Sequence, residues 1–152
     1  MYTEIKDNIF NTTAKYIMHQ VNAQGVMGAG IAKTIKDDIS YKDFIEYREF
    51  CRIHNKNALG AVLIIDSVSN SNRHYLNIIG QQYYGRNPNI VYTDYNALKI
   101  AFLQIAKSLP EGTEIAIPYR MGAGLANGDW RVIKNLIQTY LNKLNVFVYR
   151  LQ

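Results

Sequence analysis

Two glycine-rich stretches with nearly the same residues lie about ninety positions apart in this chain of 152 residues. Met27-Gly28-Ala29-Gly30-Ile31-Ala32 returns as Met121-Gly122-Ala123-Gly124-Leu125-Ala126, each time after an apolar run and before a helical pattern. Glycine has no Cβ atom, so such a backbone can turn tightly and approach a ligand closely. A loop that opens a helix also presents unpaired N–H groups, which suit a phosphate. The repeat therefore predicts a ligand with more than one phosphate.

The composition predicts one globular domain over residues 1–152. Hydrophobic residues make up 48% of the chain and charged residues 19%, which is far from a disordered composition. The formal net charge of +5 favours an anionic ligand, but the basic residues are scattered, so we do not expect a nucleic-acid partner. No apolar run reaches the roughly 18–20 residues of a membrane span, and no signal peptide is apparent. We expect a cytoplasmic monomer with no membrane contact.

The cysteine and histidine content argues against a metal site. Cys51 is the one cysteine, so a disulfide framework and a cysteine-based zinc site are excluded. His19, His54 and His74 are far apart in sequence, and no cluster of carboxylates joins them. We therefore expect neither a metal nor a cofactor.

Hydrophobic periodicity and turn residues predict an alternation of strands and helices. We expect strands over 2–6, 16–21, 61–65, 74–80, 114–118 and 145–151, and helices from 28 or 29 to about 36 and over 41–54, 95–109 and 130–144. Ser40, Asp94 and either Asn127 or Asp129 are the expected N-caps of the last three helices. The near-continuous apolar run 61–65 is typical of a strand buried on both faces. The order predicts a three-layer α/β/α domain with a mixed sheet of about six strands. Ligands of such sheets bind beyond the carboxyl ends of strands, where both glycine loops would lie.

Two familiar phosphate-binding motifs do not fit the first loop. A Walker A loop ending at Lys33 would need glycine in place of Met27 and Ala32. A dinucleotide fingerprint would need glycine or alanine in place of Lys33, or of Asn127 in the second loop. Neither ATP hydrolysis nor hydride transfer is therefore expected. The alternative without a ligand is that both loops are merely tight turns.

The longer pattern resembles the macro domain, an ADP-ribose-binding fold. It consists of His19-x-x-Asn22-x-x-Gly25-x-Met27-Gly28-x-Gly30-Ile31-Ala32 and Pro118-x-x-Met121-Gly122-x-Gly124-Leu125-x-x-Gly128-Asp129-Trp130. These motifs are similar to the subclass that groups terminal ADP-ribose protein glycohydrolase with phage and bacterial ADP-ribose-1″-phosphate phosphatases. The resemblance extends from Ile5 to Leu151.

The resemblance implies a binding role for both loops. The first would hold one phosphate and the distal ribose, and the second would wrap the diphosphate through backbone N–H groups. Asn22 would lie beside the distal ribose and Tyr149 near the adenine, although Asn22 could instead bond its own backbone and Tyr149 could be a core residue. The implied ligand-binding residues are Asn8, Ile9, Asn22, Gly25, Met27, Gly28, Ala29, Gly30, Ile31, Gln81, Met121, Gly122, Ala123, Gly124, Leu125 and Tyr149.

The chain departs from the family pattern in two places. The aspartate that usually accepts from the adenine amino group is replaced by Asn8, with Asp7 one position earlier, so either residue could make this contact. The glycohydrolase lysine and aspartate correspond to Gly80 or Gln81 and to Ala126. A Schiff-base mechanism therefore has no nucleophile here.

The remaining candidates for chemistry are His19, Asn22, Gln81, Gln82 and Asp129. The pair Tyr83-Tyr84 could close over the distal ribose, or could belong to an exposed loop without a ligand. His19 could instead be packed within the sheet, and Asp129 could be a helix cap. We expect a hydrolase, most simply an ADP-ribose-1″-phosphate phosphatase. The alternatives are a non-catalytic reader of ADP-ribose or ADP-ribosylated protein, and an ADP-ribosyl or O-acyl-ADP-ribose hydrolase that uses water positioned by Asn22.

Overall fold

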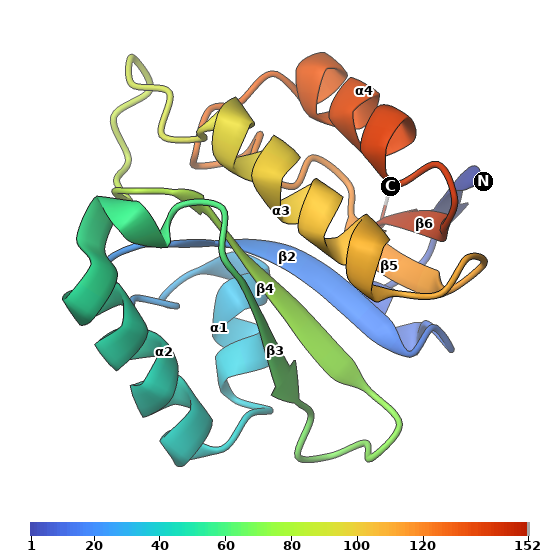
Figure 1. The fold of residues 1–152 in the computed structure, drawn as a ribbon, viewed down its shortest axis with the longest axis horizontal. Coiled ribbons are helices and arrows are strands. Elements are labelled where there is room, and N and C mark those ends of the chain that lie inside the picture. The colour runs from blue at the N-terminus through green and yellow to red at the C-terminus, as the bar shows by residue number, and fades with distance from the viewer. Residues whose placement is uncertain (152) are drawn as a thin grey trace.

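A single mixed sheet organises the chain (Figure 1). The computed structural model describes residues 1–151, and the order of strands across the sheet is β1-β6-β5-β2-β4-β3. All neighbouring strands are parallel except the β3–β4 pair. The strands are β1 (Tyr2–Lys6), β2 (Tyr16–Asn22), β3 (Val62–Asp66), β4 (His74–Gln81), β5 (Glu114–Pro118) and β6 (Asn145–Arg150).

Helices cover both faces of this sheet and complete three layers (Figure 1). Alternate residues of β2 point to opposite faces, so Met18 enters the core under α3 and α4 while Ile17 enters the core on the α1 and α2 side. The helices are α1 (Gly30–Lys36), α2 (Tyr41–His54), α3 (Tyr95–Ser108) and α4 (Trp130–Tyr140), with 3-10 turns η1 (Ile9–Asn11) and η2 (Asn55–Ala58). The predicted α/β/α class and mixed six-stranded sheet are confirmed. No helix within residues 1–151 has the length and apolarity to cross a bilayer.

Side-chain caps begin three of the four helices at the positions that the sequence indicates. Ser40 accepts from the Asp43 N–H at 3.0 Å, and Asp94 accepts from the Ala97 N–H at 2.9 Å. Asp129 accepts from the Arg131 N–H at 2.9 Å and caps α4. Each cap satisfies an N–H group that the helix itself leaves unpaired.

Strand β3 corrects one prediction, because it is not buried on both faces. It lies at the edge of the sheet, pairs only with β4, and leaves the side chain of its central residue, Ile64, 57% exposed. Its neighbour Ile65 points to the other face and is buried. A short apolar run does not distinguish a central parallel strand from a half-covered edge strand, because both contain the same β-branched residues.

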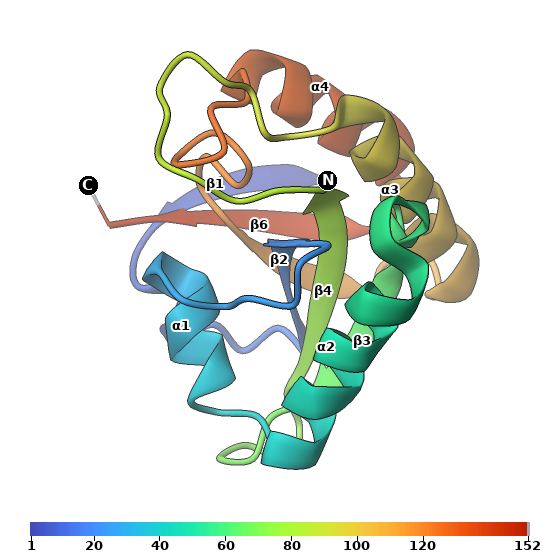
Figure 2. The same ribbon diagram turned by 90° about the vertical axis from the view of Figure 1, so that its left-hand side faces the viewer.

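The parallel strands bring three loops to one end of the sheet, where the carboxyl ends of the strands lie. β2, β4 and β5 end there, and segments 23–29, 82–94 and 119–129 follow them. Figure 2 shows these segments, coloured blue, yellow-green and orange, gathered beyond the ends of the strands. The two glycine stretches of the sequence therefore face each other across the sheet end.

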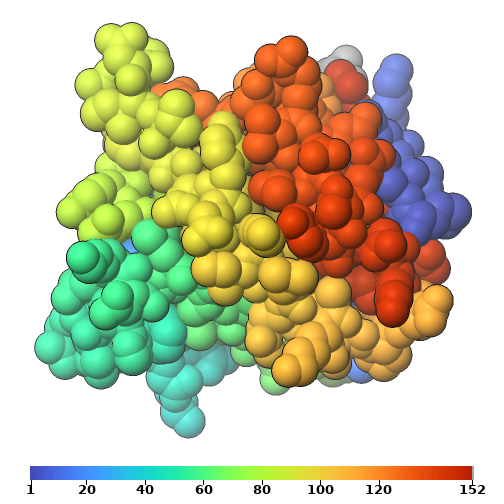
Figure 3. Space-filling view, turned by 45° about the horizontal axis from the view of Figure 1, so that its top comes forward, coloured from blue at the N-terminus to red at the C-terminus, as the bar shows by residue number. Residues whose placement is uncertain are grey.

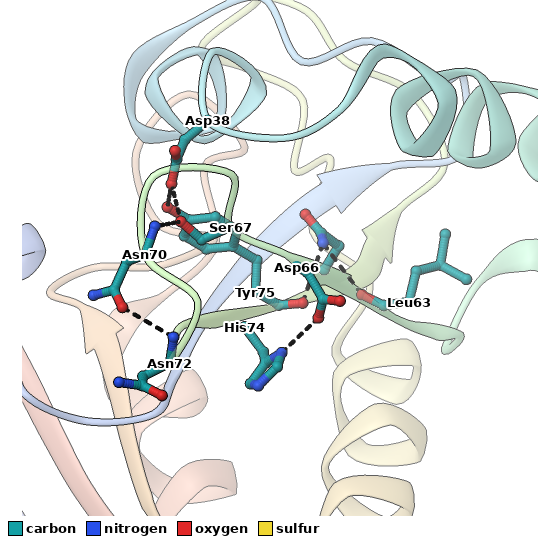
Figure 4. Close-up of polar contacts among 9 residues, drawn as sticks. Asp38, Leu63, Asp66, Ser67, Asn70, Asn72, His74 and Tyr75 are labelled. Atoms are coloured by element: carbon teal, nitrogen blue, oxygen red, sulfur yellow. Dashed lines mark hydrogen bonds and ion pairs between the residues drawn. The ribbon is translucent and has the colours of Figure 1, made fainter.

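A carboxylate ties the opposite end of the sheet together (Figure 4). One oxygen of Asp38, between α1 and α2, accepts from Ser67 Oγ at 2.5 Å and from Tyr75 OH at 2.6 Å. Its other oxygen accepts from the Ser69 N–H at 2.9 Å. Burial raises the pKa of Asp38, but these hydrogen bonds outweigh it and lower the pKa to about 2. The ionised carboxylate thus holds the β3–β4 connection against the α1–α2 turn.

We predict that Asp38→Asn removes a stabilising contribution that depends on pH. Because the folded pKa is depressed, the contribution is complete above the unfolded value near pH 4 and is lost as pH falls toward 2. The carboxylate is only partly buried, so solvent screening reduces the effect to about 1 kcal/mol at pH 7. Urea unfolding of the wild type and the variant at pH 7 and pH 3 measures it.

Asp37→Asn is the matched control, because this neighbouring carboxylate makes no side-chain hydrogen bond with the described residues and should leave the unfolding midpoint unchanged. Equal destabilisation by both variants would contradict the role given to Asp38.

Candidate functional site

The three loops enclose a cleft of about 780 Å³ at the carboxyl edge of the sheet. His19 contributes to its lining from β2, and Tyr84 and Arg86 contribute from segment 82–94. The structure brings most of the predicted binding residues together here. Those that line the cleft are Asn22, Gly28, Ala29, Gly30, Ile31, Gln81, Met121, Gly122, Gly124 and Leu125.

A second cleft of about 510 Å³ adjoins the first and holds the other predicted group. Asn8, Ile9 and Tyr149 line it, and the two clefts share Ile31, Pro118 and Tyr119. A molecule with two dissimilar ends could therefore occupy both clefts and pass beside these shared residues. Asp7 also lines the second cleft. Both side chains already accept hydrogen bonds in this turn, Asn8 Oδ1 from the Phe10 N–H at 2.9 Å and Asp7 Oδ1 from Asn11 Nδ2 at 2.9 Å, so the choice between them for a ligand contact stays a prediction.

Four predicted binding or catalytic residues lie outside both linings, as do Gln82 and Tyr83 of segment 82–94. Gly25 packs against the backbone of Arg48 on α2, with a φ of +76° that favours glycine. Met27 and Ala123 point into the core and are buried. Asp129 caps α4 and pairs with the Arg131 guanidinium at 2.9 Å, and its hydrogen bond with Arg131 lowers the pKa of this carboxyl. The first three shape the loops, and Asp129 serves as the helix cap considered above.

Backbone N–H groups of the first loop have no protein partner where they line the cleft. Among residues 1–151, no hydrogen bond is made by the N–H groups of Gly28, Ala29, Gly30 or Ile31. Ala29 is the N-cap of α1 and supplies no side-chain cap. The first turn of this helix therefore presents its unpaired donors to the cleft.

The second loop also has backbone N–H groups without a protein partner, although it forms a series of turns rather than the start of a helix. The Met121 and Ala123 N–H groups bond to the carbonyl oxygens of Pro118 and Arg120. The donors between and after them make no hydrogen bond within the described part of the chain, namely those of Gly122, Gly124, Leu125 and Ala126. The two glycine loops thus line the cleft with two sets of unpaired N–H groups, an arrangement that can bind anionic oxygens.

The Asn22 side chain is used within the first loop. Its Oδ1 accepts from the N–H groups of Gln24 at 3.0 Å and Val26 at 3.2 Å, and its Nδ2 donates to the Val26 carbonyl at 2.8 Å. Tyr47 OH, from α2, donates to the Asn22 carbonyl at 2.7 Å. Asn22 thus lines the cleft while it holds the loop in shape, which is the alternative weighed from its position after a strand.

His19 lies at the floor of the cleft and is almost completely buried. Its Nε2 bonds to Asn77 Oδ1 on the adjacent strand β4, while its Nδ1 has no partner among the described residues. Burial lowers the pKa of His19 to about 4, and the hydrogen bond with Asn77 opposes this only in part. The imidazole is therefore neutral at pH 7.

Segment 82–94 contributes Tyr84, Gly85 and Arg86 to the wall of the larger cleft. Tyr83 and Tyr84 are more than half exposed, and Figure 3 shows this part of the chain, yellow-green, standing out at one corner of the molecule. The Tyr84 N–H donates to Gln24 Oε1 at 2.9 Å, which ties the segment to the first loop. The described residues that line the larger cleft include no aspartate, glutamate, lysine or cysteine. Nor does any group of three metal-binding side chains occur within residues 1–151.

Sequence reasoning missed three polar residues around the larger cleft. Gln20 and Arg120 line it, and Thr93 bonds to the second loop from behind. Gln20 could have been noticed, because it is a polar residue in an otherwise largely apolar strand. Thr93 gives no such signal, since a threonine before a helix is ordinary.

Comparisons with known proteins identify the fold. No protein-family model and no curated protein sequence matches the chain. Among solved structures, the macrodomain of Thermus aquaticus DarG is 21% identical with a TM-score of 0.74 and matches 99% of this chain and 98% of its own. A macrodomain protein from Streptomyces coelicolor is 22% identical with a TM-score of 0.74, over 99% of both chains. The chain therefore has the macrodomain fold.

A further similar structure was solved with a ligand. Thermosipho africanus DarTG in complex with ADP-ribose is 18% identical with a TM-score of 0.73, and the match covers 97% of this chain and 41% of that one. At these identities the likeness concerns the fold.

We predict that Gly122→Ala lowers the free energy of unfolding by about 1–2 kcal/mol, because φ at Gly122 is +77° and a Cβ there would lie 2.7 Å from Gln20 Oε1. Gly124→Ala is the matched control in the same loop. A Cβ at Gly124 meets no atom within 4 Å, so its stability should be unchanged or slightly higher. Urea unfolding measures both. Similar values for the two variants would contradict the loop geometry.

Proposed function

We propose that residues 1–152 form one macrodomain that binds ADP-ribose or an ADP-ribose derivative. The observation that carries this proposal is the two sets of unpaired N–H groups with which the glycine loops line one cleft. A diphosphate offers oxygens to both sets at once. The fold shared with a DarTG structure that contains ADP-ribose supports the same ligand.

The adjoining cleft gives the proposed ligand a direction. Its lining combines the Tyr149 ring with the polar groups of Asp7 and Asn8, which suits an adenine ring and its amino group. The diphosphate would then pass Ile31 and Tyr119, and the distal ribose would end under Tyr84. Arg86 and Arg120 place positive charge along the cleft, as an anionic ligand requires.

The finer proposal is hydrolysis of the 1″-phosphate of ADP-ribose-1″-phosphate. Water attacks phosphorus, the bond between phosphorus and the 1″ oxygen breaks with its electron pair on that oxygen, and the oxygen takes up the proton that the attacking water has given to His19 as inorganic phosphate forms. Loop N–H groups stabilise the developing negative charge, and neutral His19 takes the proton of the attacking water. Asn22 and Asp129 have weaker support, since one holds its own loop and the other caps α4.

A second candidate is a reader that binds ADP-ribose or ADP-ribosylated protein without turnover. It is favoured by the cleft lining, which has no carboxylate or lysine among its described residues. It is also favoured by the depth of His19, whose lowered pKa makes it a weak base. Assays of phosphate release and of ADP-ribose binding on the same preparation separate the two candidates.

We predict that Gly28→Val and Gly124→Val each abolish ADP-ribose binding in calorimetry. A branched side chain would cover the N–H groups that the ligand approaches. Both variants should fold, since a Cβ meets nothing closer than 3.6 Å at Gly28 and nothing within 4 Å at Gly124. Their thermal unfolding should therefore match that of the wild type. Retained affinity in both variants would place the ligand elsewhere.

If the chain is a phosphatase, we predict that His19→Ala lowers phosphate release from ADP-ribose-1″-phosphate by at least about 100-fold, the usual contribution of a general base. His54→Ala, at the exposed end of α2, is the control and should keep full activity. Release that survives His19→Ala would remove His19 from the mechanism. Binding of ADP-ribose with no release by the wild type would favour the reader.

A further inference from the structure

A short chain of neutral hydrogen bonds runs beneath the second glycine loop. Gln20 Nε2, from β2, donates to Gln81 Oε1 at 2.9 Å and to Thr93 Oγ1 at 3.0 Å. Thr93 Oγ1 in turn donates to the Gly122 carbonyl at 2.6 Å. The sequence separations are 73 residues for Gln20 and Thr93 and 29 residues for Thr93 and Gly122. This series of hydrogen bonds therefore joins three segments of the protein that lie far apart in the sequence.

The carbonyl group of Gly122 belongs to the peptide that sets the conformation of the second glycine loop. The Gly122 oxygen also accepts from the Gly128 N–H at 2.9 Å, so two donors fix the orientation of one peptide group. At this residue φ is +77°, in the left-handed region that glycine adopts readily, so the two donors select one of several conformations open to the loop. The Ala123 N–H of the same peptide bonds to the Arg120 carbonyl at 2.8 Å. With this peptide fixed, the N–H groups of Gly122 and Gly124 remain unpaired in a wall of the cleft.

Further contacts hold Thr93 in place. It is buried, and its N–H bonds to the Ala126 carbonyl at 3.2 Å, at the other end of the same loop. Thr93 also forms an isolated bridge with Gln81, the last residue of β4. The hydroxyl is therefore held from two sides, so it supports the loop without a contribution from the ligand.

We infer that Thr93, oriented by Gln20, is a positioning residue that preorganises the second glycine loop for an anionic ligand. This assignment rests on the proposed function in taking the ligand to be ADP-ribose. A loop already fixed in its binding conformation loses less conformational freedom when the ligand arrives, which increases affinity. None of the groups in this chain of hydrogen bonds titrates near neutral pH, so the support does not depend on pH.

The test compares Thr93→Val with Thr93→Ser. Valine keeps the shape of threonine but removes the donor to Gly122, whereas serine keeps the hydroxyl. Thr113→Val is the matched control, because Thr113 Oγ1 donates to the Pro110 carbonyl at the same 2.6 Å in a turn after α3, outside both clefts. Calorimetry with ADP-ribose should show a loss of about three- to tenfold for Thr93→Val. Thr93→Ser and Thr113→Val should stay within about twofold of the wild type.

Affinity for adenosine, which carries no phosphate, separates positioning from a general loss of structure. It should be the same in the wild type and in Thr93→Val, because the second loop is not required to hold it. An equal loss of affinity for adenosine and ADP-ribose would overturn the positioning role.

A measurement without ligand keeps this inference separate from the proposed function. Backbone ¹⁵N relaxation should show the Gly122 and Gly124 amides rigid in the wild type and in Thr93→Ser, and mobile in Thr93→Val. Gln20→Leu, which removes the amide that orients Thr93, should mobilise the same amides. Rigid amides in Thr93→Val would overturn the inference whether or not ADP-ribose binds. If the amides are mobile in Thr93→Val and the wild type does not bind ADP-ribose, the positioning role is supported and the proposed function is contradicted.

Discussion

Strand β2 pairs in parallel with β4 on one side and with β5 on the other, so three neighbouring strands end at the same edge of the sheet. Each must be followed by a loop at that edge. The two glycine stretches are therefore opposed because of the topology, although about ninety residues separate them. Backbone donors that would be a liability in a buried loop are left unpaired here at the walls of an open cleft.

Most of the fold could be predicted from the sequence, because its signals are local. The Ser40 cap and the period of α2 lie within one helix, and the prediction of Tyr41–His54 is confirmed. The error at β3 has the opposite origin. Whether Ile64 is covered depends on where α3 lies over the sheet, and no feature of the run 61–65 carries that information.

The position of the glycine loops in the candidate site could be predicted from the sequence, but the roles of its polar side chains could not. Glycines of both loops line one cleft, as the repeated motif indicated, and the binding role proposed for them stays a prediction. Asn22 and Asp129 are residue types that serve both chemistry and local backbone capping, and in this structure their side chains cap the backbone. Thr93 acts through a partner 29 residues away, so its position could come only from the fold.

The two edge strands of the sheet, β1 and β3, differ in how well they are protected against pairing with a strand of another molecule. On β1, Glu4 pairs with Lys134 at 3.6 Å, which places charge at that edge. On β3, the charged residue is Asp66 at the end of the strand, residues 62–65 carry no charge, proline or bulge, and Ile64 is exposed at the centre. Unpaired backbone groups beside an apolar side chain are the usual template for adding a strand from another molecule. Self-association of concentrated protein should therefore begin at β3, on the opposite edge of the sheet from Glu4.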